Sequence, residues 1–364
     1  MLQAKNIQRP KAEATSMVAQ LVECVPNISE GRDIETINAI VDVVRATPGC
    51  TVLGVEPDHD YNRTVITFAG EPSAVKEGAK ALIGESISKL DMRTHSGEHP
   101  RMGVVDVCPF VPLSGISMGE CAQLARDVVS ELAETHPVPF YLYGEASTSG
   151  GRKLLSTLRK GQYEGLEARY SGGESPHNDE TRWPDLGPRE WSTTVAKSGA
   201  ITVGARPILV AYNVNVNETD AFVSKMIGSI VRSSGRLLKS EQGGKIRSHG
   251  MLNHVQGMGV PLEEMGISQV SMNLLDVSEC PLHLAYRTCQ SLASDHGIDL
   301  CGSEIVGLVP LAAMLDAGRY FAPDAEDHDA LVDAAVIGLG LNEHHSFEPM
   351  KHIIEWALAS EVVE

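Results

Sequence analysis

The stretch PILVAYNVNVNETDAFVSKMIGSIVR (residues 207–232) reads as a β-strand followed by an α-helix. Residues 246–256, 268–277, 281–296 and 298–305 continue the pattern as β, β, α and β. The complete order β, α, β, β, α, β is that of a ferredoxin-like split βαβ unit. This half of the chain therefore predicts one α/β unit, followed by a helical tail.

The first half has the same order of elements. Apolar residues alternate over 19–25, and Pro26 breaks that strand before a helical pattern that ends at Pro48-Gly49. Strands are then expected over 51–55, 64–69, 102–109 and 139–143, with helices over 72–89 and 118–134. The halves share no residue-level repeat. We therefore predict an α/β (α+β) protein of two ferredoxin-like, βαββαβ-type subdomains.

The segment SGGESPHNDETRW (171–183) is rich in Gly, Pro and acidic residues and has no apolar period. This composition is typical of a mobile connector. The predicted boundaries are a disordered extension over 1–19, an N-terminal subdomain over 20–170, a connector over 171–200 and a C-terminal subdomain over 201–364.

Composition excludes several classes of protein. The 364 residues are 42% hydrophobic and 21% charged, which is typical of a folded chain. The formal charge of −18 repels nucleic acid. No apolar run approaches the roughly 20 residues of a membrane span, and residues 1–19 lack a signal core. Seven scattered Cys fit buried thiols in a reducing cytoplasm.

Two polar loops carry the candidate chemistry. In MRTHSGEHPRMG (92–103), His95 and His99 could bind a metal, one of them could act as a general acid/base, or both could serve the loop's own structure. In EPDHDYNR (56–63), carboxylates could orient a catalytic His, and Arg63 could hold a substrate carboxylate. Taken alone, the second pattern fits an ordinary hydrophilic hairpin loop slightly better.

Read in order, several strings resemble the formiminotransferase family, also called the glutamate formimidoyltransferases. They are LVECVPNISEGR (21–32), NRTVITFAG (62–70), GEHPRMGVVDVCPFVP (97–112), PFYLYGEA (139–146), PDLGP (184–188) and GSEIVGLVP (302–310). The resemblance implies transfer of a formimidoyl group between N-formimidoyl-L-glutamate and tetrahydrofolate, in histidine degradation. It also implies two α/β subdomains with a cleft between them, and a homodimer.

The resemblance also implies site residues. The family's catalytic His falls on His99, and its folate-binding stretch runs from Gly187 and Pro188 to Gly199, within the connector. Glu56 stands where the family often has Asp, and we expect it to orient His99. Charge alone suggests Arg63, Arg101 and Arg206 as residues that bind substrate carboxylates. Tetrahydrofolate is then a co-substrate, and no metal is expected.

Alternatives remain open. The donor could be 5-formyltetrahydrofolate, the chain could bind folate without catalysis, or His95 and His99 could serve a metal-dependent hydrolase. Some family members carry a cyclodeaminase domain after this one, and the sequence predicts a free-standing transferase without it. The expected partners are small molecules, folate and glutamate, rather than nucleic acid or a membrane, and the expected compartment is the cytoplasm.

Overall fold

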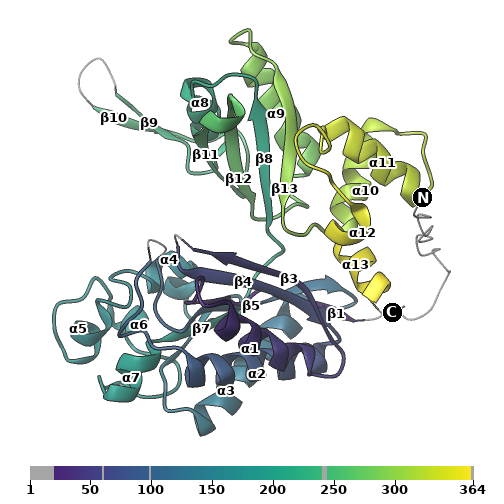
Figure 1. Cartoon of the computed structure of the whole chain (residues 1–364). Coiled ribbons are helices and arrows are strands. Elements are labelled where there is room, and N and C mark those ends of the chain that lie inside the picture. The colour runs from purple at the N-terminus through teal and green to yellow at the C-terminus, as the bar shows by residue number, and fades with distance from the viewer. Residues whose placement is uncertain (1–19, 60, 98–99, 240–243, 362–364) are drawn as a thin grey trace. The chain divides into compact units, whose positions relative to one another are not determined.

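The computed structural model describes residues 20–59, 61–97, 100–239 and 244–361. The chain divides into two compact units between Pro207 and Ile208 (Figure 1). The predicted extension over 1–19 lies outside the described residues. Among the residues described, no helix has both the length and the apolar character that a membrane crossing requires.

The N-terminal unit contains a seven-stranded sheet. Its strands are β1 (Leu21–Cys24), β2 (Asn27–Ile28), β3 (Cys50–Asp58), β4 (Arg63–Gly70), β5 (Val105–Ser114), β6 (Phe140–Gly144) and β7 (Ile201–Ala205). β1 and β2 are two pieces of one strand on either side of the predicted break at Pro26, and both pair antiparallel with β4 and β5. β3 pairs with β4. This order, β3, β4, β1/β2, β5, is ferredoxin-like, and β7 and β6 extend it in parallel from β5.

Three helices cover one face of this sheet (Figure 1). They are α1 (Ile34–Arg45), α2 (Pro72–Lys89) and α3 (Met118–Thr135). The buried stripe of α1, including Ile37 and Val41, shares a core with Phe68 of β4. Asp33 caps α1 by accepting hydrogen bonds from two backbone N–H groups, a contact whose loss typically costs about 1 kcal/mol.

The C-terminal unit contains a four-stranded antiparallel sheet in the order β11, β12, β8, β13. Its elements are β8 (Val210–Val216), α8 (Phe222–Val231), β9 (Arg236–Lys239), β10 (Lys245–Ser248), β11 (Val255–Leu262), β12 (Ile267–Leu274), α9 (Leu282–Ser294), β13 (Leu300–Val306), α10 (Leu311–Phe321), α11 (His328–Leu339), α12 (Pro349–His352) and α13 (Ile354–Glu361). The order of these four strands is again ferredoxin-like. The predicted fold class of two such units is confirmed.

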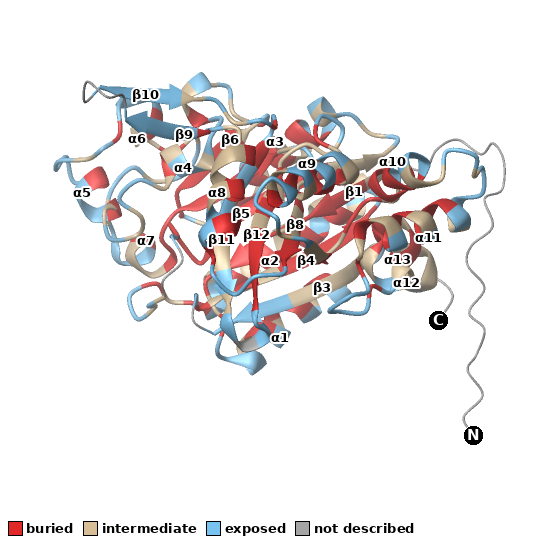
Figure 2. Ribbon diagram, turned by 90° about the horizontal axis from the view of Figure 1, so that it is seen from above, coloured by how far each residue is buried: buried red, intermediate tan, exposed pale blue. Residues whose placement is uncertain are grey.

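The prediction of one strand over residues 246–256 is wrong. β10 ends at Ser248 and β11 begins only at Val255. Between them, Gly250 lies against the carbonyl of Arg232, so closely that a Cβ would stand 1.8 Å from its oxygen, and His254 has a φ of 54°. The chain therefore turns here. β9 and β10 form a separate two-stranded ribbon that is mostly exposed, in contrast to the buried central strands (Figure 2).

The two units divide after Pro207, and not after residue 200 as the sequence predicts. β7 was expected in the C-terminal part, but it pairs in parallel with β5 and with β6 of the N-terminal sheet. The sequence could not indicate this, because a buried parallel strand shows only a short apolar run and not its pairing partners.

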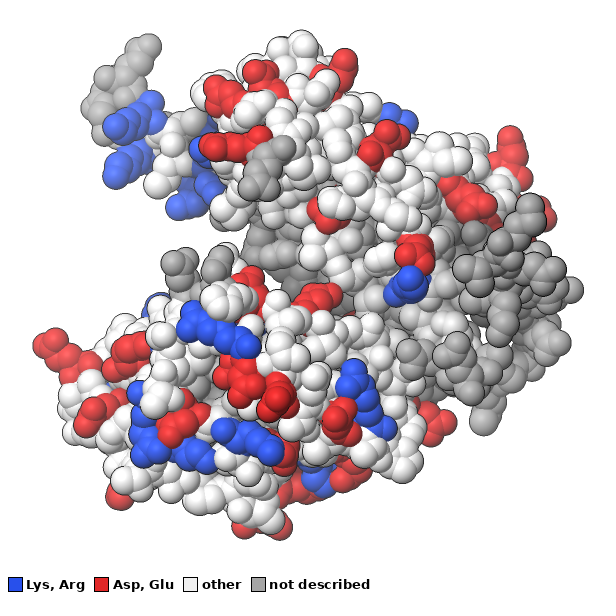
Figure 3. Space-filling view, in the orientation of Figure 1, with Lys and Arg blue, Asp and Glu red and all other residues white. Residues whose placement is uncertain are grey.

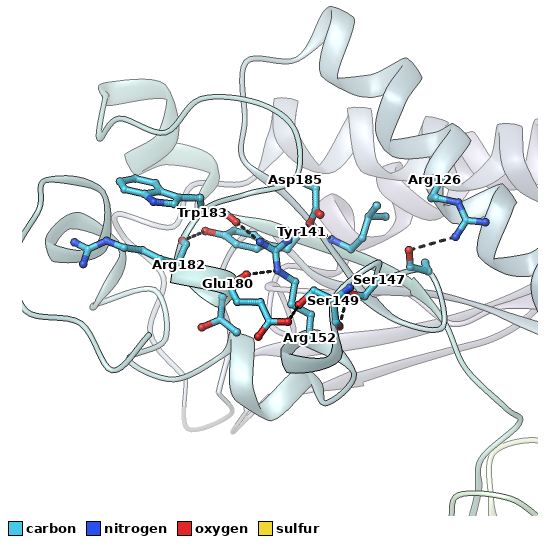
Figure 4. A network of polar contacts seen from close by, with 12 residues as sticks. Arg126, Tyr141, Ser147, Ser149, Arg152, Glu180, Arg182, Trp183 and Asp185 are labelled. Carbon is cyan, nitrogen blue, oxygen red and sulfur yellow. Dashed lines mark hydrogen bonds and ion pairs between the residues drawn. The ribbon is translucent and has the colours of Figure 1, made fainter. Parts of the chain in front are cut away.

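The segment 171–200 belongs to the N-terminal unit and does not separate the two units. It contains α6 (Asp179–Arg182) and α7 (Thr193–Ser198), after α4 (Leu155–Leu158) and α5 (Leu166–Tyr170). Figure 4 shows the contacts that hold it. Arg152 donates to the carboxylate of Asp185 and to the carbonyl of Trp183, the latter at 2.8 Å. Tyr141 of β6 donates to the carbonyl of Arg182, also at 2.8 Å.

Candidate functional site

The strand directions bring distant parts of the N-terminal unit to one edge of its sheet. β4 and β5 are both antiparallel to β2, and β7 is parallel to β5, so β4, β5 and β7 all begin at this edge. The loop after β2 joins the segment before β5 there, because Ser29 Oγ donates to the carbonyl of Gly103 at 2.8 Å. The segment before β7 joins as well, because Ala200 N donates to the carbonyl of Met102 at 3.0 Å.

Asn62 connects two of these loops. Its φ is 49°, a left-handed conformation that Asn tolerates better than most residues. Its Oδ1 accepts from Gly31 N at 3.0 Å, and its Nδ2 donates to the carbonyl of Ser96 at 2.9 Å. Its own carbonyl is 2.8 Å from Nε2 of His95. Sequence reasoning gave Asn62 no role; the available signal was an Asn at a turn immediately before a strand.

Both ring nitrogens of His95 are occupied. Nε2 faces the carbonyl of Asn62 and donates to it, while Nδ1 accepts from Nε of Arg101 at 3.2 Å. This pair of contacts requires the neutral ring. Burial and then the nearby charge of Arg101 lower the pKa of His95, although the bond to Asn62 opposes them. His95 therefore has no free nitrogen for a metal ion in this arrangement.

Arg101, which charge alone suggested as a substrate-binding residue, is buried and paired within the protein. Its NH1 and NH2 donate to the two carboxylate oxygens of Glu164, at 3.0 and 2.6 Å. Partial burial acts to raise the pKa of Glu164, but the bonds from Arg101 outweigh it and lower that pKa. Sequence reasoning missed Glu164. The Nε of Arg101 is bound to His95. The guanidinium group therefore holds the loop in place, and its donors are used within the protein rather than by a ligand.

A second buried pair lies beside it. Arg159 donates from Nε and NH2 to both oxygens of Asp106, which also accepts from Met102 N at 3.0 Å. Burial raises the pKa of Asp106, whereas Arg159, the Met102 N–H and the charge of Arg63 favour the carboxylate. With this many donors around it, we assign Asp106 as ionised. Arg159 was also missed from sequence.

Arg63 is the third cation of this group. Its Nε is buried and has no hydrogen-bond partner within the described structure. Burial lowers its pKa and Asp106 raises it, but a guanidinium stays protonated at neutral pH. A small cavity of about 10 Å³ lies beside it, lined by Ile28, Ser29, Tyr61, Asn62, Arg63, His95, Arg101 and Asp106. Besides Asp106, the carboxylates of Asp58 and Glu56 interact with the charge of Arg63.

Glu56 lies on the same face of the sheet as Arg63. Glu56 pairs with Val65 across β3 and β4, and directly opposed residues lie on the same face of a sheet. Residues two apart along a strand, such as Arg63 and Val65, also lie on one face. The carboxyl is largely exposed. The surrounding protein partly desolvates it and raises the pKa of Glu56, whereas the charge of Arg63 lowers it. His99, the predicted catalytic residue, lies outside the described residues.

The predicted folate-binding residues fall at two places on this edge. Gly199, before β7, has a φ of 64°, and a Cβ there would stand 2.2 Å from the carbonyl oxygen of Met102. Gly187, with a φ of 90°, approaches the carbonyl oxygen of Val138, just before β6, in the same way. Backbone packing thus requires both glycines. Pro188 follows Gly187 in the same loop.

Arg206 does not join this group. It follows the last residue of β7, and Arg206 N donates to the carbonyl of Phe110. β7 is five residues long, so its two ends are about 17 Å apart. Arg206 therefore lies at the opposite edge of the sheet from Arg63 and Arg101. Charge in the sequence could not reveal this, because it does not report strand direction.

Fold and site together define an α/β protein of two ferredoxin-like units with a cluster of arginine and carboxylate side chains at one sheet edge. The family model of the formiminotransferase domain, N-terminal subdomain, matches residues 21–206, and that of the formiminotransferase domain matches residues 211–359. The chain belongs to this family, as the resemblance of its motifs predicted.

The chain is similar to three relatives in particular. It is 33% identical to the glutamate formimidoyltransferase of Streptococcus pyogenes, over 88% of this chain and 100% of that protein. It is 38% identical to the glutamate formimidoyltransferase of Thermoplasma acidophilum, over 83% of this chain and 92% of that protein. It is 40% identical to the formimidoyltransferase-cyclodeaminase of Rattus norvegicus over 93% of its own length, but spans only 60% of that relative.

Proposed function

We propose that this chain transfers a formimidoyl group between N-formimidoyl-L-glutamate and tetrahydrofolate, in histidine degradation and one-carbon metabolism. The observation that carries the proposal is the alignment with the Streptococcus glutamate formimidoyltransferase, which extends over that enzyme's whole length. Arg63 adds physical support, because both substrates carry carboxylates and a guanidinium group is a suitable partner for a carboxylate.

The reaction requires one general acid/base and two substrates held in alignment. In the direction of histidine degradation, N5 of tetrahydrofolate attacks the formimidoyl carbon and gives a tetrahedral adduct. The bond from that carbon to the glutamate nitrogen then breaks. The proton lost by N5 goes to the departing amine. In our proposal His99 takes this proton as a base and returns it as an acid, a role typically worth about 10² to 10⁴ in rate. Holding the substrates together contributes much of the remainder.

The other proposed roles follow the geometry. Glu56, on the same sheet face as Arg63, orients His99. Arg63 holds a substrate carboxylate. The loop from Gly187 and Pro188 to Gly199 binds the folate, and its C-terminal end adjoins Met102, the residue after Arg101. Arg101 acts through His95 and Glu164 on the shape of the loop. We retain no substrate-binding role for Arg206, because it lies at the far edge of the sheet.

The proposal includes a cytoplasmic location and a homodimer, with no metal required. A reducing compartment is consistent with the free thiols, since the sulfur atoms of Cys24 and Cys108 are 3.5 Å apart and not bonded. Tetrahydrofolate is a co-substrate in this scheme rather than a resident group.

Purified protein incubated with tetrahydrofolate and N-formimidoyl-L-glutamate tests the reaction directly, with the folate product followed by absorbance. We expect turnover that depends on both substrates, and faster reverse reaction with glutamate from 5-formimidoyltetrahydrofolate than from 5-formyltetrahydrofolate. Folate binding without turnover would contradict the proposal.

His99→Gln tests the proton carrier. We expect loss of turnover while folate binding is kept, with Gln replacing the imidazole by a side chain that does not titrate. His59→Gln is the matched control, because His59 is an exposed imidazole on the neighbouring loop. Near wild-type kcat in folded His99→Gln protein would remove His99 from the mechanism.

A further inference from the structure

The turn RKGQYE (residues 159–164) lies between α4 and α5 and contacts two loops of the candidate site. Its backbone conformation is unusual, since Gly161 and Gln162 have φ values of 79° and 52°. Two left-handed residues in succession reverse the chain tightly, and Gln162 N donates to the carbonyl of Arg159 at 2.7 Å. The turn places Tyr163, the next residue, between the two loops.

The main chain of this turn is bound to the segment that precedes β5. Tyr163 N donates to the carbonyl of Arg101 at 2.9 Å. Gln162 Oε1 accepts from NH1 of Arg101 at 3.4 Å, and Glu164 pairs with the same guanidinium group. Three successive residues of the turn thus contact Arg101, so the backbone of Tyr163 is held against it.

The side chain of Tyr163 contacts the other loop, the proposed folate-binding stretch over 187–199. Its hydroxyl donates to the carbonyl of Ala196 in α7 at 2.6 Å. Its ring lies 6.1 Å from the ring of Trp191, at an angle of 53°. Both rings pack against one small cluster of buried apolar residues, which includes Val195. Tyr163 therefore joins the Arg101 segment to the folate-binding stretch.

The bond to Ala196 completes the C-terminal end of α7. The last carbonyls of a helix have no N–H partner within it. Backbone N–H groups of Met92 and Val104 donate to the last two carbonyls of α7, at 2.8 Å each, and the hydroxyl of Tyr163 donates to the carbonyl of Ala196. A carbonyl that loses its donor must find another, or the end of the helix must move. The phenol therefore helps to fix the position of α7.

Charge on the surface does not direct an anionic folate to this loop. On the face of the N-terminal unit that Figure 3 shows, basic and acidic side chains are interspersed, and the whole chain has a formal charge of −18. Long-range attraction of an anion is weak under these conditions. The affinity for folate then depends on contacts within the site, and so on the position of the loop that makes them.

We propose that Tyr163 is a positioning residue for the folate substrate, because its phenol holds the 187–199 stretch against the Arg101 segment. This inference rests on the proposed function, of which the role of that stretch in folate binding is a part. Tyr163 acts through Ala196 and α7 and takes no part in proton transfer. Its hydroxyl should therefore matter for tetrahydrofolate more than for N-formimidoyl-L-glutamate.

Tyr163→Phe removes the hydroxyl and keeps the ring that packs beside Trp191. We expect KM for tetrahydrofolate to rise about 3- to 10-fold, the scale of one hydrogen bond, while KM for N-formimidoyl-L-glutamate changes less than about 2-fold. The dissociation constant for tetrahydrofolate, measured by calorimetric titration, should rise as well. Equal changes in both KM values, or no change in either, overturn the proposal.

Tyr212→Phe is the matched control. It removes a phenol hydroxyl that donates to Ser303 Oγ at 2.9 Å in the core of the C-terminal unit. It should lower the temperature of unfolding and leave both KM values unchanged. Thermal unfolding of both variants separates a general loss of stability from a selective loss of affinity for folate.

Hydrogen exchange tests the contact independently of activity. The backbone N–H groups of α7 and its C-cap are bonded to carbonyls one turn earlier. We expect peptides that contain residues 192–199 to exchange several-fold faster in Tyr163→Phe than in the wild type, and at the wild-type rate in Tyr212→Phe. Unchanged exchange of these peptides in Tyr163→Phe overturns the proposal.

The role of Tyr163 and the proposed function can fail separately. A chain that has no turnover but binds tetrahydrofolate, and binds it more weakly in Tyr163→Phe, would count against the proposed function and support the role of Tyr163. Normal turnover in the wild type, with equal affinities for tetrahydrofolate in the wild type and in Tyr163→Phe, would leave the function standing and overturn the role of Tyr163.

Discussion

Arg63 brings a positive charge to the wall of a small cavity, where the carboxylate of Asp106 is already bound to Arg159. The buried Nε of Arg63 has no acceptor within the described structure, and the adjoining cavity of about 10 Å³ is about the size of one water molecule. In our proposal the guanidinium group of Arg63 holds a substrate carboxylate. At the scale of single residues, the charge of Arg63 interacts with the carboxylates of Asp106, Asp58 and Glu56.

Replacement of Arg63 by Ala should therefore weaken the enzyme for its carboxylated substrate. We expect kcat/KM for N-formimidoyl-L-glutamate to fall about 10- to 100-fold, mostly through KM, which corresponds to the loss of one charge-assisted hydrogen bond. Steady-state kinetics provide the measurement. Arg45→Ala on the exposed side of α1 is the control and should leave both constants unchanged. An unaltered KM in the Arg63 variant would place the carboxylate elsewhere.

Glu164 should stabilise the fold in a pH-dependent way. Its pKa is lowered in the folded protein, so its contribution is fully present above its unfolded pKa, near 4.5, and is lost as pH falls through the folded value. Glu164→Gln leaves the buried Arg101 without its charge partner. Because the Glu164 side chain is 62% exposed and solvent screens the pair, we expect a loss of about 0.5–1 kcal/mol of unfolding free energy at pH 7.

Urea unfolding of both proteins at pH 7 and at about pH 3.5 checks this. The difference between wild type and Glu164→Gln should shrink at the lower pH, because the wild-type carboxylate is partly protonated there. Glu145→Gln, which removes the charge from an exposed pair with Lys153, is the control and should cost little at either pH. A difference that does not change with pH would argue against the pairing of Glu164 with Arg101.

At the scale of elements, the site is a set of loops that meet where β4, β5 and β7 begin. Asn62 is the residue that ties them, since it bonds to the loop after β2 and to the loop before β5. Gly31 and Gly97 allow the close approach: a Cβ on either would stand within about 2.2 Å of a backbone oxygen of Asp58 or Tyr61. The conformation of each loop therefore depends on its contacts with the other loops.

Asn62→Ala and Asn62→Gly separate the two roles of this residue. Both variants lose the side-chain bonds, but Gly accepts a φ of 49° without strain, so Asn62→Gly should be the more stable by about 1 kcal/mol. Both should lose activity to a similar degree, because the loop that holds His95 is released in each. Thermal unfolding and kcat are the measurements. Full activity in Asn62→Gly would show that the side-chain bonds do not position the site.

At the scale of the whole molecule, two ferredoxin-like units follow each other along the chain, and the first is enlarged by β6 and β7. β7 lies between β5 and β6 and pairs with both. Without it, β6 would have no strand neighbour among the described residues, and the buried side of Phe140 and Leu142 would lose its cover. The N-terminal unit is therefore complete only with the residues up to Pro207.

Two fragments test this division. Residues 20–207 should give a cooperative unfolding transition, while residues 20–200 should unfold at a lower temperature or not fold, because two of the sheet's parallel pairings are absent. Circular dichroism during heating, with proteolysis as a second probe, provides the comparison. Equal stability of the two fragments would contradict the placement of β7 in this unit.

Local pattern determined much of this protein. Periodicity and breaker residues predicted the element order of both units, including the strand broken at Pro26, and the motif strings predicted the family. The pattern failed where the answer depended on contacts between distant segments. One strand was expected where the chain turns at Gly250, and β7 was assigned to the wrong half.

The site divides in the same way. Sequence singled out Arg63, Arg101 and Glu56 because charged groups cluster visibly in two loops. Only the tertiary structure distinguished Arg63, whose Nε has no acceptor within the described structure, from Arg101, which Glu164 neutralises from 63 residues away. Only strand direction separated Arg206 from both. The physical reason is that residue type fixes what a group can bind, whereas burial and the neighbours brought by folding fix whether it is free to bind it.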